Sequence, residues 1–257
     1  MNSKELTNYY IDSLQKKGMN KVELFMSSSK KYELNTAGEE LTLLRTIFDT
    51  NLSIAAVKEG KKGVISLNKT DDESIDKAVE SLMEIVDNSE PDTANDISPM
   101  QPAGEFVRGE AEPDLDKMYV RLSNFLTAVK KRYPKIQLME SFLDFTQSCD
   151  HYANSNGVEL DSTMGTYGFQ LTFASKDGEK SSSFNYSGFT AKNLDKELLE
   201  CGSIDLLLKQ SVEQLDTKAL EGKFTGDVII TPDCLGDMIE MYLDVYLRDM
   251  ALIAGTS

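Results

Sequence analysis

The sequence has no tryptophan, one histidine and three cysteines in 257 residues. The single histidine, His151, cannot by itself supply the three or four ligands that a zinc site requires. The cysteines show no Cys-x-x-Cys spacing, and an odd number of cysteines without a signal sequence is typical of reduced thiols. We therefore expect a cytoplasmic protein without a disulfide framework. The cysteines are Cys149, Cys201 and Cys234.

Long apolar runs and an excess of positive charge are also absent. No run of about 18 apolar residues could cross a membrane, and the polar first residues lack the apolar core of a signal peptide. The 43 Asp and Glu residues outnumber 27 Lys and Arg residues, giving a net charge of −16, which repels nucleic-acid phosphates. Two short basic clusters, 16–17 and 130–132, fall in the last turns of predicted helices, where cations favour the helix dipole. We expect neither a nucleic-acid nor a membrane partner.

The chain is 40% hydrophobic and 27% charged, which is typical of a globular protein. Apolar residues that recur every three or four positions predict amphipathic helices. The expected helices cover residues 3–17, 70–88, 114–132 and 204–215, with a long helix after Pro232. Thr70 and Glu73 form a predicted capping box at the start of the second helix.

Alternating apolar and polar residues predict strands between these helices. The expected strands cover residues 22–26, 31–35, 41–48, 52–58, 64–68, 136–148, 151–154, 158–166, 167–175, 179–186 and 227–231. The predicted turns include 37–38, 49–51, 59–63 and the Asn156-Gly157 hairpin turn, which is the strongest local β signal. The last strand, Asp227 to Thr231, is expected to be short and buried.

These elements predict an α+β fold with mostly antiparallel sheets, packed amphipathic helices and two sub-domains. Residues 1–88 form the expected N-terminal α+β domain. Residues 89–113, which hold four of the six prolines, form an acidic linker or strap. Residues 114–257 form the second α+β domain with an antiparallel meander, expected to be truncated at its C-terminus.

Candidate chemistry is sparse in the residues themselves. Cys149 and His151 share a strand face and could form a nucleophile pair, although ordinary strand positions are the simpler interpretation. Acids near the predicted turns could form a cross-strand acid–base pair, which a strongly acidic chain also produces by chance. These acids are Glu33, Glu39, Glu40, Asp144, Asp150, Glu159 and Asp161.

Two small-residue motifs are weaker still. Gly60 to Gly63 lacks phosphate-loop spacing and lies between two strands, so a hairpin turn is expected. Ser181 to Ser183 has no nucleophile-elbow sequence around it. No catalytic, cofactor-binding or metal-binding residue is therefore assigned in this chain.

Four segments, in this order and spacing, resemble the PmbA/TldD family, which is also known as the modulators of DNA gyrase. They are KYELNTAGEELTLLRTIFDTNLSIAAVKEGKKGVISLN, DDESIDKAVESLMEIVDNSEPD, YANSNGVEL and GDVIITPDCLGDMI. The resemblance implies a link to a metal-dependent peptidase. Catalytic members carry His-Glu-x-x-x-His on the helix after the last segment, and alignment on Pro232 places Glu240, Met241 and Val245 at those three positions. None matches, so zinc is expected only in a catalytic partner subunit.

The resemblance thus implies a non-catalytic, PmbA- or TldE-like subunit. Its expected partners are a TldD-like catalytic subunit, further copies of itself, and unfolded peptide substrates. Family members continue beyond the length of this chain. Two rival hypotheses remain: an acidic protein-binding or scaffold module without a peptidase role, and a Cys149/His151 hydrolase.

Overall fold

The computed structural model describes residues 3–69, 71–219, 221–223 and 225–256. The predicted α+β fold is confirmed, and the sheet is antiparallel except where β4 pairs parallel to β6. The strands are β1 (Lys21–Ala37), β2 (Glu40–Lys58), β3 (Lys61–Leu67), β4 (Gly104–Arg108), β5 (Ile136–Asn154), β6 (Glu159–Asp177), β7 (Lys180–Ser181) and β8 (Asn185–Ala191). The helices are α1 (Ser3–Lys16), α2 (Asp72–Asn88), α3 (Leu115–Arg132), α4 (Ile204–Glu213), α5 (Pro232–Tyr246) and α6 (Asp249–Ala254), with 3-10 turns η1 (Leu198–Glu200) and η2 (Gln214–Asp216).

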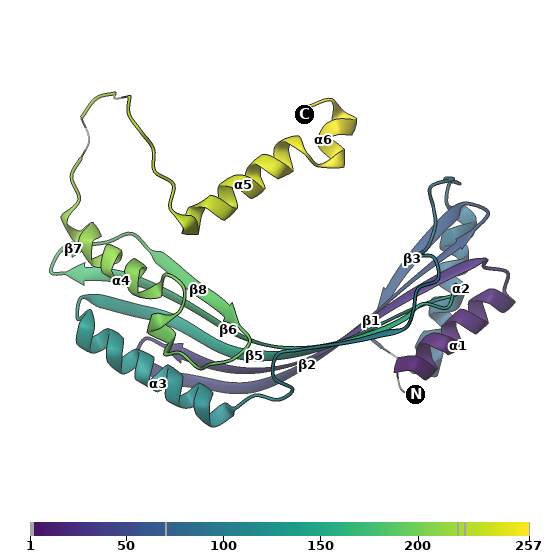
Figure 1. Ribbon diagram of the computed structural model, residues 1–257, viewed down its shortest axis with the longest axis horizontal. Coiled ribbons are helices and arrows are strands. Elements are labelled where there is room, and N and C mark those ends of the chain that lie inside the picture. Colours follow the sequence, from purple (N-terminus) through teal and green to yellow (C-terminus); the bar gives the residue numbers. More distant parts are fainter. Residues whose placement is uncertain (1–2, 70, 220, 224, 257) are drawn as a thin grey trace.

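Four long strands give the molecule its arched shape (Figure 1). They have 17 to 19 residues each, and the strand order is β3-β2-β1-β5-β6-β4, with β7 and β8 also paired to β6. The predicted turn at 49–51 is wrong, because Asp49, Thr50 and Asn51 pair with β1 without interruption. Continuous pairing with a neighbouring strand outweighs the turn preference of these polar residues. The other predicted strand breaks inside β1, β5 and β6 are absent for the same reason.

The hairpin turns that contain glycine are confirmed. Gly38, Gly157 and Gly178 have positive φ values of 63°, 87° and 59°, which glycine adopts without steric cost. Each connects two antiparallel strands, as the sequence predicts. The glycine positions therefore set where these strands reverse.

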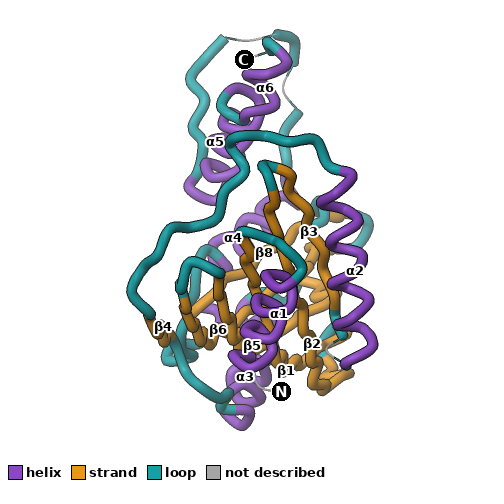
Figure 2. Tube along the Cα trace, turned by 90° about the vertical axis from the view of Figure 1, so that its right-hand side faces the viewer, coloured by secondary structure: helices purple, strands orange, loops and turns teal. Residues whose placement is uncertain are grey.

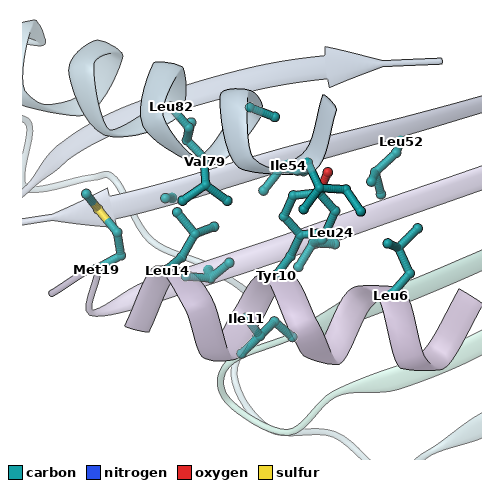
Figure 3. Close-up of a cluster of buried hydrophobic side chains, with 14 of the residues drawn as sticks. Leu6, Tyr10, Ile11, Leu14, Met19, Leu24, Leu52, Ile54, Val79 and Leu82 are labelled. Atoms are coloured by element: carbon teal, nitrogen blue, oxygen red, sulfur yellow. The ribbon is translucent and has the colours of Figure 1, made fainter. Parts of the chain in front are cut away.

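One hydrophobic core lies under α1 and α2, at the end of the sheet where β1 begins (Figure 3). Tyr10 and Leu14 of α1, and Val79 and Leu82 of α2, pack against Leu24 and its neighbours in β1 and β2. Asp71 caps α2 by accepting a hydrogen bond from the Ser74 backbone N–H at 3.0 Å. The predicted cap Thr70 lies outside the described residues.

A second core lies under α3, α4 and η1 at the other end of the sheet. Phe125 of α3 stacks edge-on against Phe169 of β6, with ring centroids 5.0 Å apart. Phe145 of β5 lies 4.8 Å from Tyr167 of β6. The predicted helix 114–132 is confirmed, with Asp114 as its cap.

Both cores lie on one face of the sheet. The buried side chains of β5 occupy alternate positions along the whole strand, from Leu143 and Phe145 to His151 and Ala153, and alternate residues share a face. We call this the helix face and the opposite side the open face. Side chains of α5 are not buried, and the tube view shows α5 and α6 standing away from the sheet (Figure 2).

The division into residues 1–88, 89–113 and 114–257 stays a prediction. The structure adds that β1 from the first range pairs along its length with β5 from the third. It also places β4 within the range expected to be a linker. The strap therefore contributes an edge strand to the same sheet.

The predicted strand Asp227–Thr231 is wrong. These residues are irregular, and Val228 and Ile229 are 84% and 90% exposed. An apolar run forms a strand only when another strand accepts its backbone hydrogen bonds, and none does so among the described residues. The helix expected after Pro232 is confirmed, with a break at Leu247. None of the described helices is long and apolar enough to span a membrane.

Candidate functional site

His151 is buried and both of its ring nitrogens have partners. Nδ1 lies 2.7 Å from Asp161 Oδ1 on β6, and Nε2 lies 3.1 Å from Thr7 Oγ1 on α1. Thr7 is fully buried and its hydroxyl also donates to the Lys4 carbonyl at 3.2 Å. A Thr-His-Asp series of this kind resembles a catalytic triad in its order, but the hydroxyl is closed off from any substrate. The arrangement instead holds α1 against β5 and β6.

Cys149 does not join His151. It is exposed, and its Sγ lies 4.0 Å from Thr163 Oγ1. Although both residues lie on the helix face, α1 covers His151 only. With both imidazole nitrogens engaged elsewhere, the geometry offers no base for a Cys149 nucleophile.

The open face carries a charged cluster that brings two of the predicted acids together. Glu33 of β1 is paired directly with Arg45 of β2 and with Asp144 of β5. Glu33 Oε1 accepts a hydrogen bond from Arg45 Nε at 3.0 Å and forms an ion pair with Arg45 Nη2 at 2.9 Å. Lys31 Nζ lies between the acids, 3.3 Å from Glu33 Oε2 and 3.4 Å from Asp144 Oδ2. The cluster also includes Asn35, whose Nδ2 donates to Glu33 at 2.8 Å.

The two acids of this cluster are shifted in opposite directions. Burial raises the pKa of Glu33, but the hydrogen bonds from Asn35 and Lys31 and the charges of Lys31 and Arg45 outweigh it and leave the pKa below its ordinary value. Burial raises the pKa of Asp144 above its ordinary value, and Lys31 offsets this only in part. Glu33 is therefore a fixed anion, whereas Asp144 takes up a proton more readily.

A hollow of about 490 Å3 adjoins the cluster on β5, β6 and β8. Its walls include Phe142, Gln170, Tyr186 and Gly188. Phe142 on β5 pairs with Gln170 on β6, and Asp144 pairs with Gly168. These two pairs are neighbours on the open face, because residues two apart in a strand share a face. The open face thus has a largely apolar hollow near two carboxyl groups, open to solvent rather than enclosed.

Lys31 and Arg45 were not predicted as site residues. The signal was present in β1, where Lys31, Glu33 and Asn35 alternate with Tyr32 and Leu34. Polar residues at every second position place one charged row on one face of a strand. The partner strands could not be known from that pattern. The remaining predicted acids lie outside this cluster: Glu39, Glu40, Asp150, Glu159 and Asp161.

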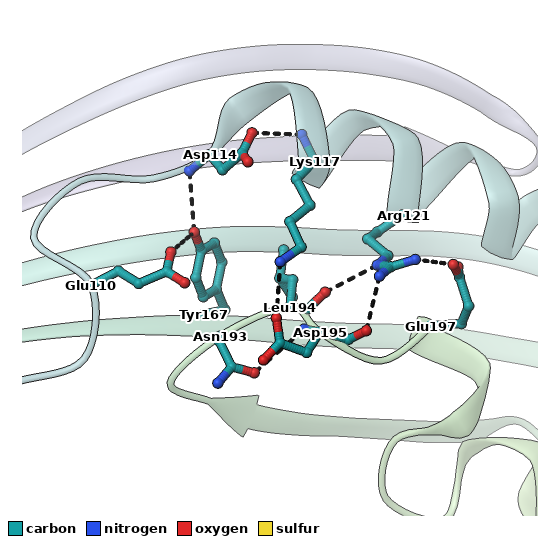
Figure 4. A network of polar contacts seen from close by, with 9 residues as sticks. All are labelled: Glu110, Asp114, Lys117, Arg121, Tyr167, Asn193, Leu194, Asp195 and Glu197. Carbon is teal, nitrogen blue, oxygen red and sulfur yellow. Dashed lines mark hydrogen bonds and ion pairs between the residues drawn. The ribbon is translucent and has the colours of Figure 1, made fainter.

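A second polar network connects α3 to the loop before η1 (Figure 4). Arg121 donates to the carbonyls of Leu194 at 3.0 Å and Asp195 at 2.9 Å, and it also binds the Glu197 carboxylate. At the start of α3, the Tyr167 hydroxyl donates to Glu110 at 2.5 Å and accepts from the Asp114 N–H at 3.1 Å. Burial, together with Glu110, raises the pKa of Tyr167 to about 12. These contacts fix the loops over the second core.

The two small-residue motifs are structural. Gly60 has a positive φ of 78° in the turn between β2 and β3, which confirms the predicted hairpin. Ser182 Oγ accepts from the Ser175 N–H at 2.8 Å, so it satisfies a backbone group at the end of β6. Both motifs thus serve the backbone, one in a turn and the other as a hydrogen-bond partner.

The positions on α5 that align with the catalytic motif do not fit a zinc ion. Glu240 is exposed, and Met241 and Val245 are 57% and 49% exposed. A thioether, an isopropyl group and one carboxylate supply none of the imidazoles that such a site uses. Across the described residues, no group of three His, Cys, Asp or Glu side chains is placed to hold a metal.

Comparison with protein families matches residues 22–86 to the domain described as PmbA/TldA metallopeptidase domain 1. This range contains all of β1 except its first residue, all of β2 and β3, and most of α2. No curated protein matches the sequence.

Solved structures share the fold over most of the chain. TldE from Thermococcus kodakarensis has a TM-score of 0.63 at 14% identity, covering 82% of this chain and 47% of its own. A proposed modulator of DNA gyrase from Bacteroides thetaiotaomicron has a TM-score of 0.69 at 15% identity, covering 84% and 51%. A protein of the same description from Thermotoga maritima has a TM-score of 0.56 at 15% identity, covering 82% and 47%. This chain spans about half the length of these structures.

Proposed function

We propose, because residues 22–86 of this chain match PmbA/TldA metallopeptidase domain 1, that the protein is a non-catalytic, TldE-like subunit of a TldD-type metallopeptidase. The complex would act on unfolded peptides. The zinc ion and the reacting groups would belong to the catalytic subunit. In this proposal the chain works in the cytoplasm, in keeping with its free cysteines.

One observation carries the proposal: a TldE-like fold is joined to a helix that lacks the catalytic residues. The family match covers β1 to α2, and the helix after Pro232 is present as α5. Glu240, Met241 and Val245 occupy the positions where catalytic relatives are expected to carry His, Glu and His. This combination favours a supporting role over chemistry of its own.

The exposed apolar surface of α5 supports an assembly. Ile239, Tyr242 and Leu243 are 50%, 61% and 45% exposed, and exposed apolar patches of this kind mark protein contacts. A lone amphipathic helix gains stability chiefly by packing its apolar face. A subunit that closes against this helix would supply that packing.

The test is a peptidase assay with zinc and an unstructured peptide. The chain alone is expected to be inactive, and its addition to a TldD-type subunit carrying His-Glu-x-x-x-His is expected to raise the cleavage rate. Cleavage by the purified chain alone that a chelator abolishes would contradict the proposal. Failure to change the rate or to bind the catalytic subunit would favour a scaffold role.

A further inference from the structure

The first half of β2 is a free edge of the sheet. β1 pairs with one side of β2 along its length, whereas β3 pairs with the other side only from Leu52 to Lys58. Residues 40–49 are all exposed. Along 40–51, therefore, no other described strand meets the backbone N–H and C=O groups on that side.

This edge lacks several of the features that usually prevent strands from pairing between molecules. Residues 40–51 contain no proline, no glycine and a single basic residue, Arg45. Large apolar side chains lie on both faces of this strand. Leu44 and Phe48 lie on one face and are 62% and 73% exposed, and Leu43 and Ile47 lie on the other face. A long, apolar and unprotected edge is a site for strand addition.

We propose that the free edge of β2 pairs antiparallel with the same edge of a second copy of this chain. Both faces of the edge carry large apolar side chains, so a partner strand with apolar side chains on both faces would fit it, and an identical strand meets this condition. The inference does not depend on the peptidase role.

Two-fold symmetry limits how the two strands can align. Directly opposite residues of an antiparallel pair point to the same face of the sheet. The two-fold axis must therefore lie between a residue and the same residue of the second copy, so that this residue pairs with itself. An axis at Arg45 would place two like charges opposite each other, which is destabilising. An axis at Ile47 places Arg45 opposite Asp49 of the second copy, twice.

Charge selects the alignment centred on Ile47. If the two-fold axis lies at any other residue from 43 to 46, no positive side chain of residues 40–51 faces a negative side chain of the second copy. This alignment pairs residues 43–51 of both copies and stops where β3 begins to occupy the edge at Leu52. Arg45 keeps its hydrogen bond and ion pair with Glu33, and its third guanidinium nitrogen, Nη1, would pair with Asp49.

Cysteine cross-linking tests this alignment directly. In an Ile47→Cys variant the two cysteines would lie opposite each other, with Cα atoms about 4.5–5.5 Å apart, which suits a disulfide. In the control, Leu43→Cys, the two cysteines would be eight positions apart, or about 26 Å. Mild oxidation is expected to give a covalent dimer with Ile47→Cys only, judged on a non-reducing gel against the unsubstituted chain.

Sedimentation of the full chain tests the surface. The chain is expected to be dimeric at about 100 µM, and Ile47→Lys is expected to weaken the dimer at least about 100-fold, because edge lysines block pairing. Ile239→Lys on α5 is expected to leave it intact. A monomeric chain, a dimer that only Ile239→Lys dissociates, or equal cross-linking of both cysteine variants would each overturn the proposal.

Discussion

Glu33 and Arg45 lie directly opposite each other on β1 and β2, and the carboxylate accepts a hydrogen bond from Arg45 Nε at 3.0 Å and forms an ion pair with Nη2 at 2.9 Å. The Glu33 side chain is only 5% exposed. A buried carboxylate with this many partners stabilises the fold only while it is ionised. The charged cluster of the open face therefore makes stability depend on pH.

Glu33→Gln is expected to lower the free energy of unfolding at pH 7 by about 2 kcal/mol, the value of a hydrogen bond to a charged group. The pKa of Glu33 lies below its ordinary 4.5 in the folded protein. Its contribution is thus present above that pH and is lost as pH falls through the folded-state pKa. Urea denaturation at pH 7 and pH 3.5 is expected to show a smaller difference between the two proteins at the lower pH.

Asp144→Asn is the matched control. The pKa of Asp144 is raised above 3.8 by burial, so the folded state holds this proton more tightly than the unfolded state. Ionisation of Asp144 therefore lowers the stability of the fold as pH rises from 3.8 through the folded-state pKa. The amide is expected to cost less than Glu33→Gln at pH 7. A larger cost for Asp144→Asn would show that the two carboxyl groups are assigned the wrong way round.

Tyr167→Phe is expected to destabilise the protein by about 1–2 kcal/mol, because Glu110 and the Asp114 N–H lose their partner. The pKa of Tyr167 is about 12, against an ordinary 10.0. Since the folded state binds this proton more tightly, stability is lost as pH rises from 10 to 12. Denaturation across that range is expected to be less steep for the variant. If both proteins lost stability equally steeply over this pH range, the loss would arise from a group other than Tyr167.

His151→Ala is expected to cost about 2–4 kcal/mol, since it removes two hydrogen bonds and leaves a cavity between α1 and the sheet. Cys149→Ala, two residues away but exposed, is expected to change stability by less than about 0.5 kcal/mol. Thermal unfolding of both variants measures this. A Cys149 effect as large as that of His151 would mean that the two side chains act together.

Gly165→Ala is expected to destabilise severely, by more than about 3 kcal/mol. An added Cβ would clash with the Glu110 carbonyl oxygen, a backbone atom that cannot move aside easily. Gly236 in α5 has nothing within 4 Å of such a Cβ, so Gly236→Ala is expected to stabilise by about 0.5–1 kcal/mol. Circular dichroism during heating compares the pair, and a mild effect of Gly165→Ala would contradict the close approach of the two backbones.

Local signals predicted the elements that depend on local physics. The cap at Asp114, the apolar face of α3 and the Asn156-Gly157 turn were all found, because each depends on residues close in sequence. The turn at 49–51 was wrong, since pairing with β1 decides that segment. The strand at 227–231 was wrong because strand formation needs a partner strand that sequence periodicity does not show.

The candidate site was harder to predict than the fold. Glu33 and Asp144 were both among the predicted acids, but 111 positions separate them along the chain. Only the pairing of β1 with β5 places them on either side of Lys31. Burial raises the pKa of both acids, and only around Glu33 do hydrogen bonds and positive charges outweigh it. Burial and these contacts are properties of the packed sheet. The sequence could supply the residues of the cluster but not their contacts.

The central claim is that this chain assembles with a metal-bearing TldD-type subunit without performing the chemistry. Its most direct test is titration calorimetry of the full chain into such a subunit, loaded with zinc. We predict saturable binding, with a negative heat-capacity change from burial of apolar surface. Absence of binding at protein concentrations of about 100 µM would contradict the account.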